Sequence, residues 1–148
     1  MKLKGSCHCR AVRFSVESET PYPYMWCYCS ICRKTAGGGG YAVNVMGRAA
    51  TLKAKGRTRV YRATRSGGER HFCPKCASAL WVRDKRWPEW IYPFASAIDT
   101  PLPRPRERQL IFLGSRASWA EVPQGRRFKR YPKEAIIDWH RKRGLLGP

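Results

Sequence analysis

Seven cysteines fall into three short clusters, and this spacing constrains the fold more than any other feature of the sequence. The clusters are Cys7-His8-Cys9, Cys27-Tyr28-Cys29-Ser30-Ile31-Cys32 and Cys73-Pro74-Lys75-Cys76. A disulfide between cysteines two residues apart would close a strained ring, and an odd count would leave one thiol unpaired. Thiolates at such spacings are typical zinc ligands, so we predict metal binding rather than cross-linking.

Four of the cysteines can form a closed zinc site, because structural zinc takes four protein ligands in a tetrahedron. On an extended segment, Cys7 and Cys9 would project to the same side of the chain. A tight turn from Cys73 to Cys76 would supply the opposing pair. We therefore predict a structural site that ties the start of the chain to its middle.

The remaining cysteines, Cys27, Cys29 and Cys32, would supply three thiolates from six consecutive residues. A catalytic zinc keeps one position open for water or substrate, which matches a three-ligand cluster. Other partitions stay open on spacing alone, such as Cys27 and Cys29 pairing with the cysteines of the 73–76 turn.

Two histidines adjoin the cysteine clusters, and imidazole also binds zinc well. Because four sulfurs already complete a site, we expect His8 to point away from the metal. We expect His71 to pair within a strand instead of ligating.

Short alternating segments predict an all-β domain of half-buried antiparallel strands. Apolar and polar residues alternate from Val12 to Val16, and similar patterns occur at 41–46, 57–63, 79–82 and 90–94. Glycine and proline interrupt them at 37–40, 65–68 and 100–105, where we expect loops. The 148 residues contain no visible repeat and fit a single domain, residues 1–148.

One helix is expected at the end of the chain. Pro132 can occupy its first turn, Ile136, Ile137 and His140 share one face, and Gly144 can stop it. The basic run 141–143 would then lie at the helix C-terminus, where the dipole favours positive charge. We prefer this interpretation to a nucleic-acid contact.

The formal net charge of +20 favours anionic partners, whether nucleic acid, acidic surfaces or small anionic substrates. Three groups of basic residues could contact phosphates: Arg57, Arg59 and Arg62; Arg104, Arg106 and Arg108; Arg126, Arg127, Lys129 and Arg130. No helix-turn-helix or zinc-finger spacing accompanies them. A zinc-stabilised basic nucleic-acid-binding module without catalysis is therefore the alternative to an enzyme.

The chain carries no sign of export or of membrane insertion. Its first residues, Met1 to Gly5, lack the apolar core of a secretory signal, and no segment approaches the roughly 18 apolar residues of a membrane span. Free cysteines persist in reducing compartments. We expect a cytoplasmic protein without a membrane partner.

Residues around the second cluster could contact a substrate. Arg33 and Lys34 follow Cys32, and we predict that they steer or hold an anionic thiol, with solvated surface charge as the alternative. The run Gly37 to Gly40 could bind a carboxylate, but we expect a simple loop. Aromatic residues near the cluster could wall a pocket, but we expect them to pack in the core: Tyr22, Tyr24, Trp26 and Tyr28.

The cysteine motifs together resemble those of the glutathione-dependent formaldehyde-activating enzyme family, which includes centromere protein V. The similar segments are 5–14, 27–34 and 71–76, and residues 131–133 and 138–140 resemble the family's C-terminal segment. Arg10 and Ala77 depart from the pattern, since glycine is usual in the family at both positions. These departures adjoin the predicted structural site and concern its backbone geometry.

The resemblance implies a zinc-stabilised β-tent with two zinc ions per chain, one structural and one catalytic. It implies a carbon-sulfur lyase activity that joins glutathione and formaldehyde into S-hydroxymethylglutathione, or runs in reverse. A small anionic thiol and a small aldehyde are then the expected partners. The implied structural ligands are Cys7, Cys9, Cys73 and Cys76, and the implied catalytic ligands are Cys27, Cys29 and Cys32.

Overall fold

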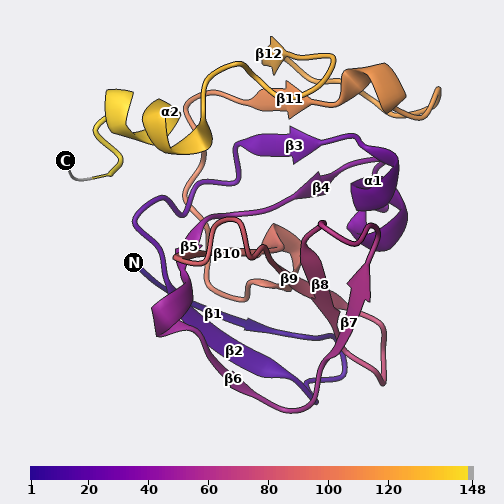
Figure 1. Ribbon diagram of the computed structural model, residues 1–148, viewed down its shortest axis with the longest axis vertical. Coiled ribbons are helices and arrows are strands. Elements are labelled where there is room, and N and C mark those ends of the chain that lie inside the picture. The colour runs from indigo at the N-terminus through magenta and orange to yellow at the C-terminus, as the bar shows by residue number, and fades with distance from the viewer. Residues whose placement is uncertain (147–148) are drawn as a thin grey trace.

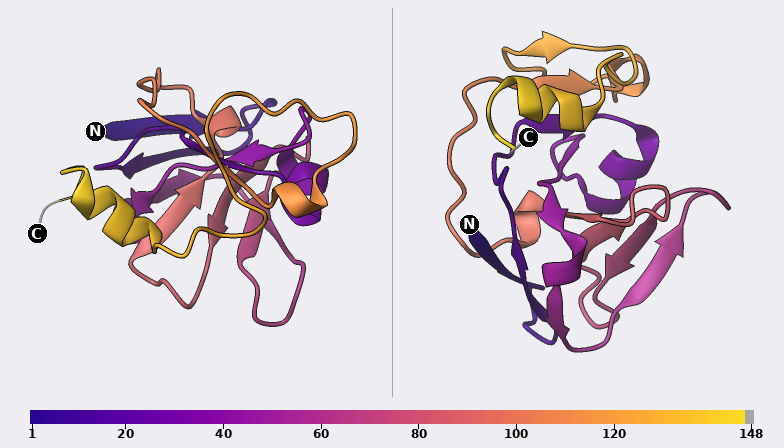
Figure 2. Two further views of the ribbon diagram at one scale, coloured as in Figure 1. Left: turned by 90° about the horizontal axis from the view of Figure 1, so that it is seen from above. Right: turned by 60° about the vertical axis from the view of Figure 1, so that its left-hand side comes forward.

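The computed structural model describes residues 1–146, which form three small β-sheets and two short α-helices (Figure 1). The sheet β1-β2-β6 lies at one end of the molecule, and β11, β12 and α2 lie at the other (Figures 1 and 2). The predicted all-β class with a C-terminal helix is confirmed.

The first sheet is antiparallel and contains β1 (Lys2–Ser6), β2 (Arg13–Glu17) and β6 (Lys53–Lys55). Leu3 lies opposite Val16, and Gly5 lies opposite Phe14. These inward-facing residues are buried, while their neighbours along β1 and β2 are mostly exposed. The period of two in the sequence thus corresponds to one buried and one solvated face.

The second sheet has five antiparallel strands in the order β5-β10-β9-β8-β7. Their bounds are β5 (Gly47–Arg48), β7 (Arg59–Arg62), β8 (Glu69–Phe72), β9 (Ala79–Arg83) and β10 (Trp90–Pro93). Trp81 on β9 packs in the main hydrophobic core, which also contains Leu3 and Val16. The two sheets therefore share one core.

The third sheet departs from the expected antiparallel pairing. It contains β3 (Met25–Cys27), β4 (Ala42–Val43), β11 (Gln109–Ile111) and β12 (Arg126–Arg127), in the order β12-β11-β3-β4. β3 pairs antiparallel with β4, but β11 pairs parallel with both β3 and β12. Local alternation predicts strands and not their partners, so it could not reveal these long-range parallel pairs.

Two α-helices and three 3-10 turns complete the described chain. The helix α1 (Ser30–Ala36) was not predicted, and it starts inside the second cysteine cluster. The predicted start of the C-terminal helix near Pro132 is wrong, because α2 (Ile136–Lys142) begins after Ala135. Gly144 follows it with a φ of 63°, as expected for a residue that ends a helix. The 3-10 turns are η1 (Ala49–Thr51), η2 (Ala95–Ala97) and η3 (Leu113–Ser115).

Trp139 and His140 anchor α2, whereas the predicted apolar residues Ile136 and Ile137 are only half-buried. The Trp139 ring stacks on Tyr24 with centroids 4.2 Å apart. Stacking of this kind adds to the free energy gained by burying the indole. The helix is thereby held against the segment that leads into β3.

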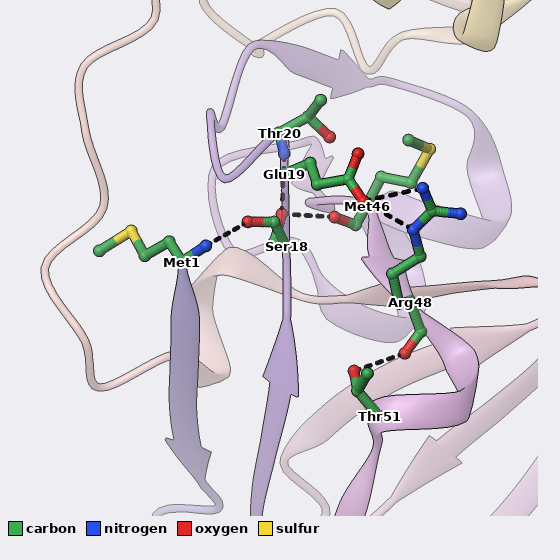
Figure 3. Close-up of polar contacts among 7 residues, drawn as sticks. All are labelled: Met1, Ser18, Glu19, Thr20, Met46, Arg48 and Thr51. Carbon is green, nitrogen blue, oxygen red and sulfur yellow. Dashed lines mark hydrogen bonds and ion pairs between the residues drawn. The ribbon is translucent and has the colours of Figure 1, made fainter. Parts of the chain in front are cut away.

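Polar contacts join the first sheet to β5 (Figure 3). The N-terminal amine donates to the Ser18 carbonyl oxygen at 2.7 Å, and the Ser18 hydroxyl donates to the Met46 carbonyl oxygen at 2.6 Å. Arg48 on β5 donates through Nε to Glu19 at 2.8 Å. The Ser18 hydroxyl is buried and finds its partner here, whereas the Arg48–Glu19 contact is exposed to solvent.

Candidate metal centres

The four-cysteine group is assembled from two hairpin turns. Cys7 and Cys9 lie in the turn between β1 and β2, and Cys73 and Cys76 lie in the turn between β8 and β9. The first pair is therefore not on an extended segment, as the sequence had suggested. The structure nevertheless brings all four Sγ atoms within 4.8 Å of one another.

The sulfur geometry fits a tetrahedral zinc ion. Cys7 Sγ lies 3.6 Å from Cys9 Sγ, and Cys9 Sγ lies 3.8 Å from Cys73 Sγ. With a Zn–S bond of about 2.3 Å, the edge of a tetrahedron is about 3.8 Å. The observed separations match that edge, whereas a disulfide would need sulfurs about 2 Å apart. All seven cysteines are free thiols.

Hydrogen-bond donors favour the thiolate form of two cysteines in this group, Cys7 and Cys76. The Val12 N–H donates to Cys7 Sγ at 3.2 Å, and the Ser78 hydroxyl lies 3.2 Å from Cys76 Sγ. The hydrogen bond from Ser78, together with backbone N–H groups, lowers the pKa of Cys76 to about 5. A deprotonated sulfur is the form that binds metal.

The three-cysteine group lies at the junction of β3 and α1. Cys27 ends β3, Cys29 precedes α1 as its N-cap, and Cys32 is buried within the helix. The Cys32 N–H donates to Cys29 Sγ at 3.3 Å, so the helix start itself positions the second sulfur. The three Sγ atoms lie within 4.8 Å of one another, and no fourth ligand of the described chain joins this group.

Hydrogen bonds among the thiols of this group shift their pKa values in different directions. Hydrogen bonds with Cys27 and Cys32 lower the pKa of Cys29 strongly. Hydrogen bonds with Cys29 and Cys32, together with burial, raise the pKa of Cys27. A bound cation would favour deprotonation of the Cys27 and Cys32 thiols as well.

A cation that the sequence did not indicate contacts the three-cysteine group. Arg70 on β8 is half-buried, and its Nη2 lies 3.7 Å from Cys32 Sγ. Its Nη1 is buried and has no hydrogen-bond partner among the described residues. No motif connects Arg70 to Cys32, because the contact depends on how the sheet that contains β8 meets α1.

The predicted substrate-contact residues are placed differently. Arg33 is half-buried and Lys34 is exposed, both on α1. Arg33 bonds to this group only through its main-chain N–H, which donates to the Cys29 carbonyl oxygen at 3.0 Å. Within the part of the chain that the structure describes, neither side chain forms a hydrogen bond to one of the three sulfurs. Their role in holding a thiol stays a prediction.

Tyr131 approaches the same cysteines from the C-terminal segment. Desolvation of its hydroxyl and the charges of Cys27, Cys32 and Cys29 raise the pKa of Tyr131 to about 12. Its side chain is nonetheless 68% exposed. The hydroxyl stays protonated at neutral pH.

The two histidines beside the cysteines lie outside both groups, as expected. His8 is exposed, and its main-chain N–H donates to the Ser78 hydroxyl at 3.1 Å. His71 belongs to β8, where its Nδ1 lies 3.1 Å from the Thr58 hydroxyl and its ring stacks on Trp81.

The aromatic residues before α1 mostly pack in the interior. Tyr24 and Tyr28 are buried, as predicted. Trp26 is half-buried, stacks on Tyr41 with centroids 4.2 Å apart, and lines a pocket with Trp119. The run 37–40 forms a turn after α1, as expected. Among residues 1–146, no helix is both long enough and apolar enough to cross a bilayer.

Comparisons with known proteins agree with the cysteine geometry. Residues 2–114 match the family model described as "Glutathione-dependent formaldehyde-activating enzyme". A Halomonas elongata protein named "Putative glutathione-dependent formaldehyde-activating enzyme" is 56% identical over 154 residues, covering 98% of each chain. The family match spans all seven cysteines and ends before Tyr131 and α2.

A solved structure of a Rhodobacter sphaeroides protein has a similar fold, with a TM-score of 0.54. The match covers 70% of this chain and 92% of the Rhodobacter chain. The sequence identity is 24%, so the likeness concerns the fold alone. The family match and the close relative, which both extend across the cysteine clusters, show that this chain belongs to the glutathione-dependent formaldehyde-activating enzyme family.

Proposed function

We propose that this protein is a carbon-sulfur lyase that forms or cleaves S-hydroxymethylglutathione or a related adduct of a thiol and a carbonyl compound. Family membership and the name of the Halomonas relative support glutathione and formaldehyde as substrates. The observation that carries the proposal is the group of three cysteines, Cys27, Cys29 and Cys32. Three ligands leave a tetrahedral ion one position for a substrate.

Both cysteine groups fit zinc by donor type and by sulfur spacing, and we propose two ions per chain. The four-cysteine group would hold a structural ion, and the three-cysteine group a catalytic one. Zinc bound at the second group would lower the pKa of a substrate thiol and so supply a nucleophile at neutral pH.

The reaction needs little further chemistry, because formaldehyde is already a strong electrophile. The thiol sulfur attacks the carbonyl carbon, a carbon-sulfur bond forms, and the proton lost by the thiol ends on the former carbonyl oxygen. The reverse reaction breaks the same bond and returns that proton to sulfur. Cys27, Cys29 and Cys32 fix where the thiol sits, which turns a bimolecular search into a local step.

Basic residues of the chain would attract an anionic thiol such as glutathione. We propose this role for Arg33 and Lys34, which lie on α1 beside the three-cysteine group. We further propose that residues 1–148 act as one domain in the cytoplasm. Seven free thiols support that location, because they persist where the surroundings are reducing.

Exchange spectroscopy by NMR tests the activity directly. The zinc-loaded protein should speed the exchange between free and hydroxymethylated glutathione at least about a hundredfold over the uncatalysed rate. Cys29→Ser should abolish the acceleration, while Thr35→Ser, a conservative change further along α1, should retain it. Wild-type protein that speeds no exchange but binds duplex DNA in a salt-dependent way would show the nucleic-acid-binding alternative to be correct.

A further inference from the structure

Among the described residues, Arg70 is the cation in direct contact with the three-cysteine group, and it comes from a different sheet than Cys27. Arg70 lies on β8 opposite Val82 of β9, and Val82 packs against the cluster that contains Cys27 and Cys32. Residues directly opposite in an antiparallel pair share a face of the sheet. The register of β8 and β9 therefore directs Arg70 toward the cysteines, and its Nη2 lies 3.7 Å from Cys32 Sγ.

The Arg70 guanidinium has a hydrogen-bond donor that no described residue uses. One terminal nitrogen approaches Cys32, while Nη1 is buried and has no partner among the described residues. A buried donor without a partner costs free energy, so its retention needs a compensating gain. An increase of negative charge beside it would supply that gain, since hydrogen bonds to charged acceptors are the stronger ones.

With a metal ion and a substrate thiolate bound, the three-cysteine site would carry more negative charge. Three deprotonated cysteines outweigh the charge of a divalent ion, and a substrate thiolate adds one more negative charge. An opposite charge within about 4–6 Å of a negative group stabilises the charged form of that group. The Arg70 guanidinium contacts Cys32 Sγ, whereas the side chains of Arg33 and Lys34 form no hydrogen bond to a sulfur of this group within residues 1–146.

We propose that Arg70 is a positioning residue that compensates the negative charge of the three-cysteine group and thereby favours binding of a thiol there. The inference rests on the proposed function, since it concerns the thiol of that reaction. Arg70 acts on the charge of the sulfur, whatever the rest of the thiol carries. It therefore supports small neutral thiols as much as glutathione.

Full-length protein loaded with Co²⁺ tests this role through the sulfur-to-metal absorption bands. Wild type, Arg70→Gln, Arg70→Lys and Arg59→Gln are titrated with glutathione and separately with 2-mercaptoethanol, which lacks carboxylates. Arg59 is an exposed arginine of β7, so Arg59→Gln is the control that removes the same charge from the neighbouring strand. Chelator competition on each variant measures metal affinity independently of thiol binding.

Arg70→Gln should weaken the binding of both thiols about tenfold or more and should lower the metal affinity of this group. Arg70→Lys should recover most of the thiol affinity. Arg59→Gln should change neither thiol affinity nor metal affinity. Arg70→Met, which keeps an apolar stem, repeats the test where the amide disturbs folding. Loss of affinity for glutathione alone would overturn the inference, because Arg70 would then bind a carboxylate. Unchanged affinities would overturn it as well.

The outcomes separate the two proposals. Wild type that binds both thiols with the expected dependence on Arg70, but does not speed exchange with formaldehyde, leaves this inference standing and overturns the proposed reaction. Wild type that exchanges rapidly while Arg70→Gln binds thiols unchanged overturns the inference alone. Wild type that binds no thiol overturns both.

Discussion

Arg10 and Ala77 adopt the same left-handed backbone conformation, with a φ of 59° at each residue. Each follows directly after the second cysteine of a pair, and each lies in the turn that closes one half of the four-cysteine group. The Arg10 N–H donates to the Cys7 carbonyl oxygen and the Ala77 N–H to the Cys73 carbonyl oxygen, both at 2.9 Å. The Arg10 hydrogen bond reaches back three residues and the Ala77 hydrogen bond reaches back four, so the two turns differ in length but both end on a left-handed residue.

Glycine at either position should stabilise the protein. A left-handed conformation costs a residue with a Cβ about 1 kcal/mol, and part of this is returned because glycine is more flexible in the unfolded chain. We expect Arg10→Gly and Ala77→Gly each to raise the free energy of unfolding by about 0.5 kcal/mol. Urea unfolding of the zinc-loaded protein measures it. Ala54→Gly, on the exposed strand β6, is the control and should destabilise. Destabilisation by all three would contradict the strain argument.

The two cysteine groups should differ in what they contribute to stability. The four-cysteine group links hairpins from two sheets, so loss of a ligand removes metal-binding free energy from folding. We expect Cys76→Ser to lower the melting temperature by about 10 °C, and Cys29→Ser by less than about 3 °C. Thermal unfolding followed by circular dichroism measures both. Equal shifts would show that the assignment of structural and open sites is wrong.

Local sequence patterns predicted the parts of the fold that depend on neighbouring residues. The alternation around Phe14 anticipated β2, and the cysteine spacing anticipated two groups of sulfurs. Arg10 and Ala77 stand where the family usually has glycine, and the structure shows positive φ at both. Each of these signals reports on a few consecutive residues.

Long-range packing explains what the sequence did not predict. The parallel pairing of β11 with β3 joins residues more than eighty positions apart, and no local pattern encodes a partner. The contact of Arg70 with Cys32 depends on the register of β8 and β9 and on how that sheet meets α1. Arg33 and Lys34 were predicted to contact the substrate because they follow Cys32 in the sequence. The cation that contacts Cys32 in the structure lies 38 positions further along the chain.

Acid should destabilise the protein partly through His140. This side chain is buried, neither ring nitrogen has a partner among the described residues, and desolvation together with the nearby charge of Arg143 lowers its pKa to about 4. In the unfolded chain the pKa is about 6.5, so the unfolded state binds the proton first. The stability that neutral His140 contributes is present above pH 6.5 and is lost as the pH falls toward 4.

We expect this contribution to decrease by about 2 kcal/mol between pH 7 and pH 5. Urea unfolding of wild type and His140→Gln at both pH values measures it, since glutamine does not titrate and proton uptake by the cysteines cancels in the difference. The loss of stability should be about 2 kcal/mol smaller in the variant. Identical pH dependence in the two proteins would show that protonation of His140 does not change the free energy of unfolding between pH 7 and pH 5.

Stepwise removal of metal gives the last prediction, which concerns both cysteine groups at once. Protein purified without chelators should contain two zinc ions per chain, because one tetrahedral ion cannot satisfy sulfurs in two separate groups. The group at Cys27, Cys29 and Cys32 offers three ligands and should release its ion first, to a weak chelator and without unfolding. The four-cysteine group should release its ion only to a strong chelator and together with tertiary structure, since that metal contributes to folding. Elemental analysis after each step, with near-ultraviolet circular dichroism of the same samples, follows both events. Cys29→Ser is the matched control and should start with one ion and show only the second event. Loss of tertiary structure on removal of the first ion, or release of both ions in one step, would mean that the two groups do not divide into an open site and a structural one.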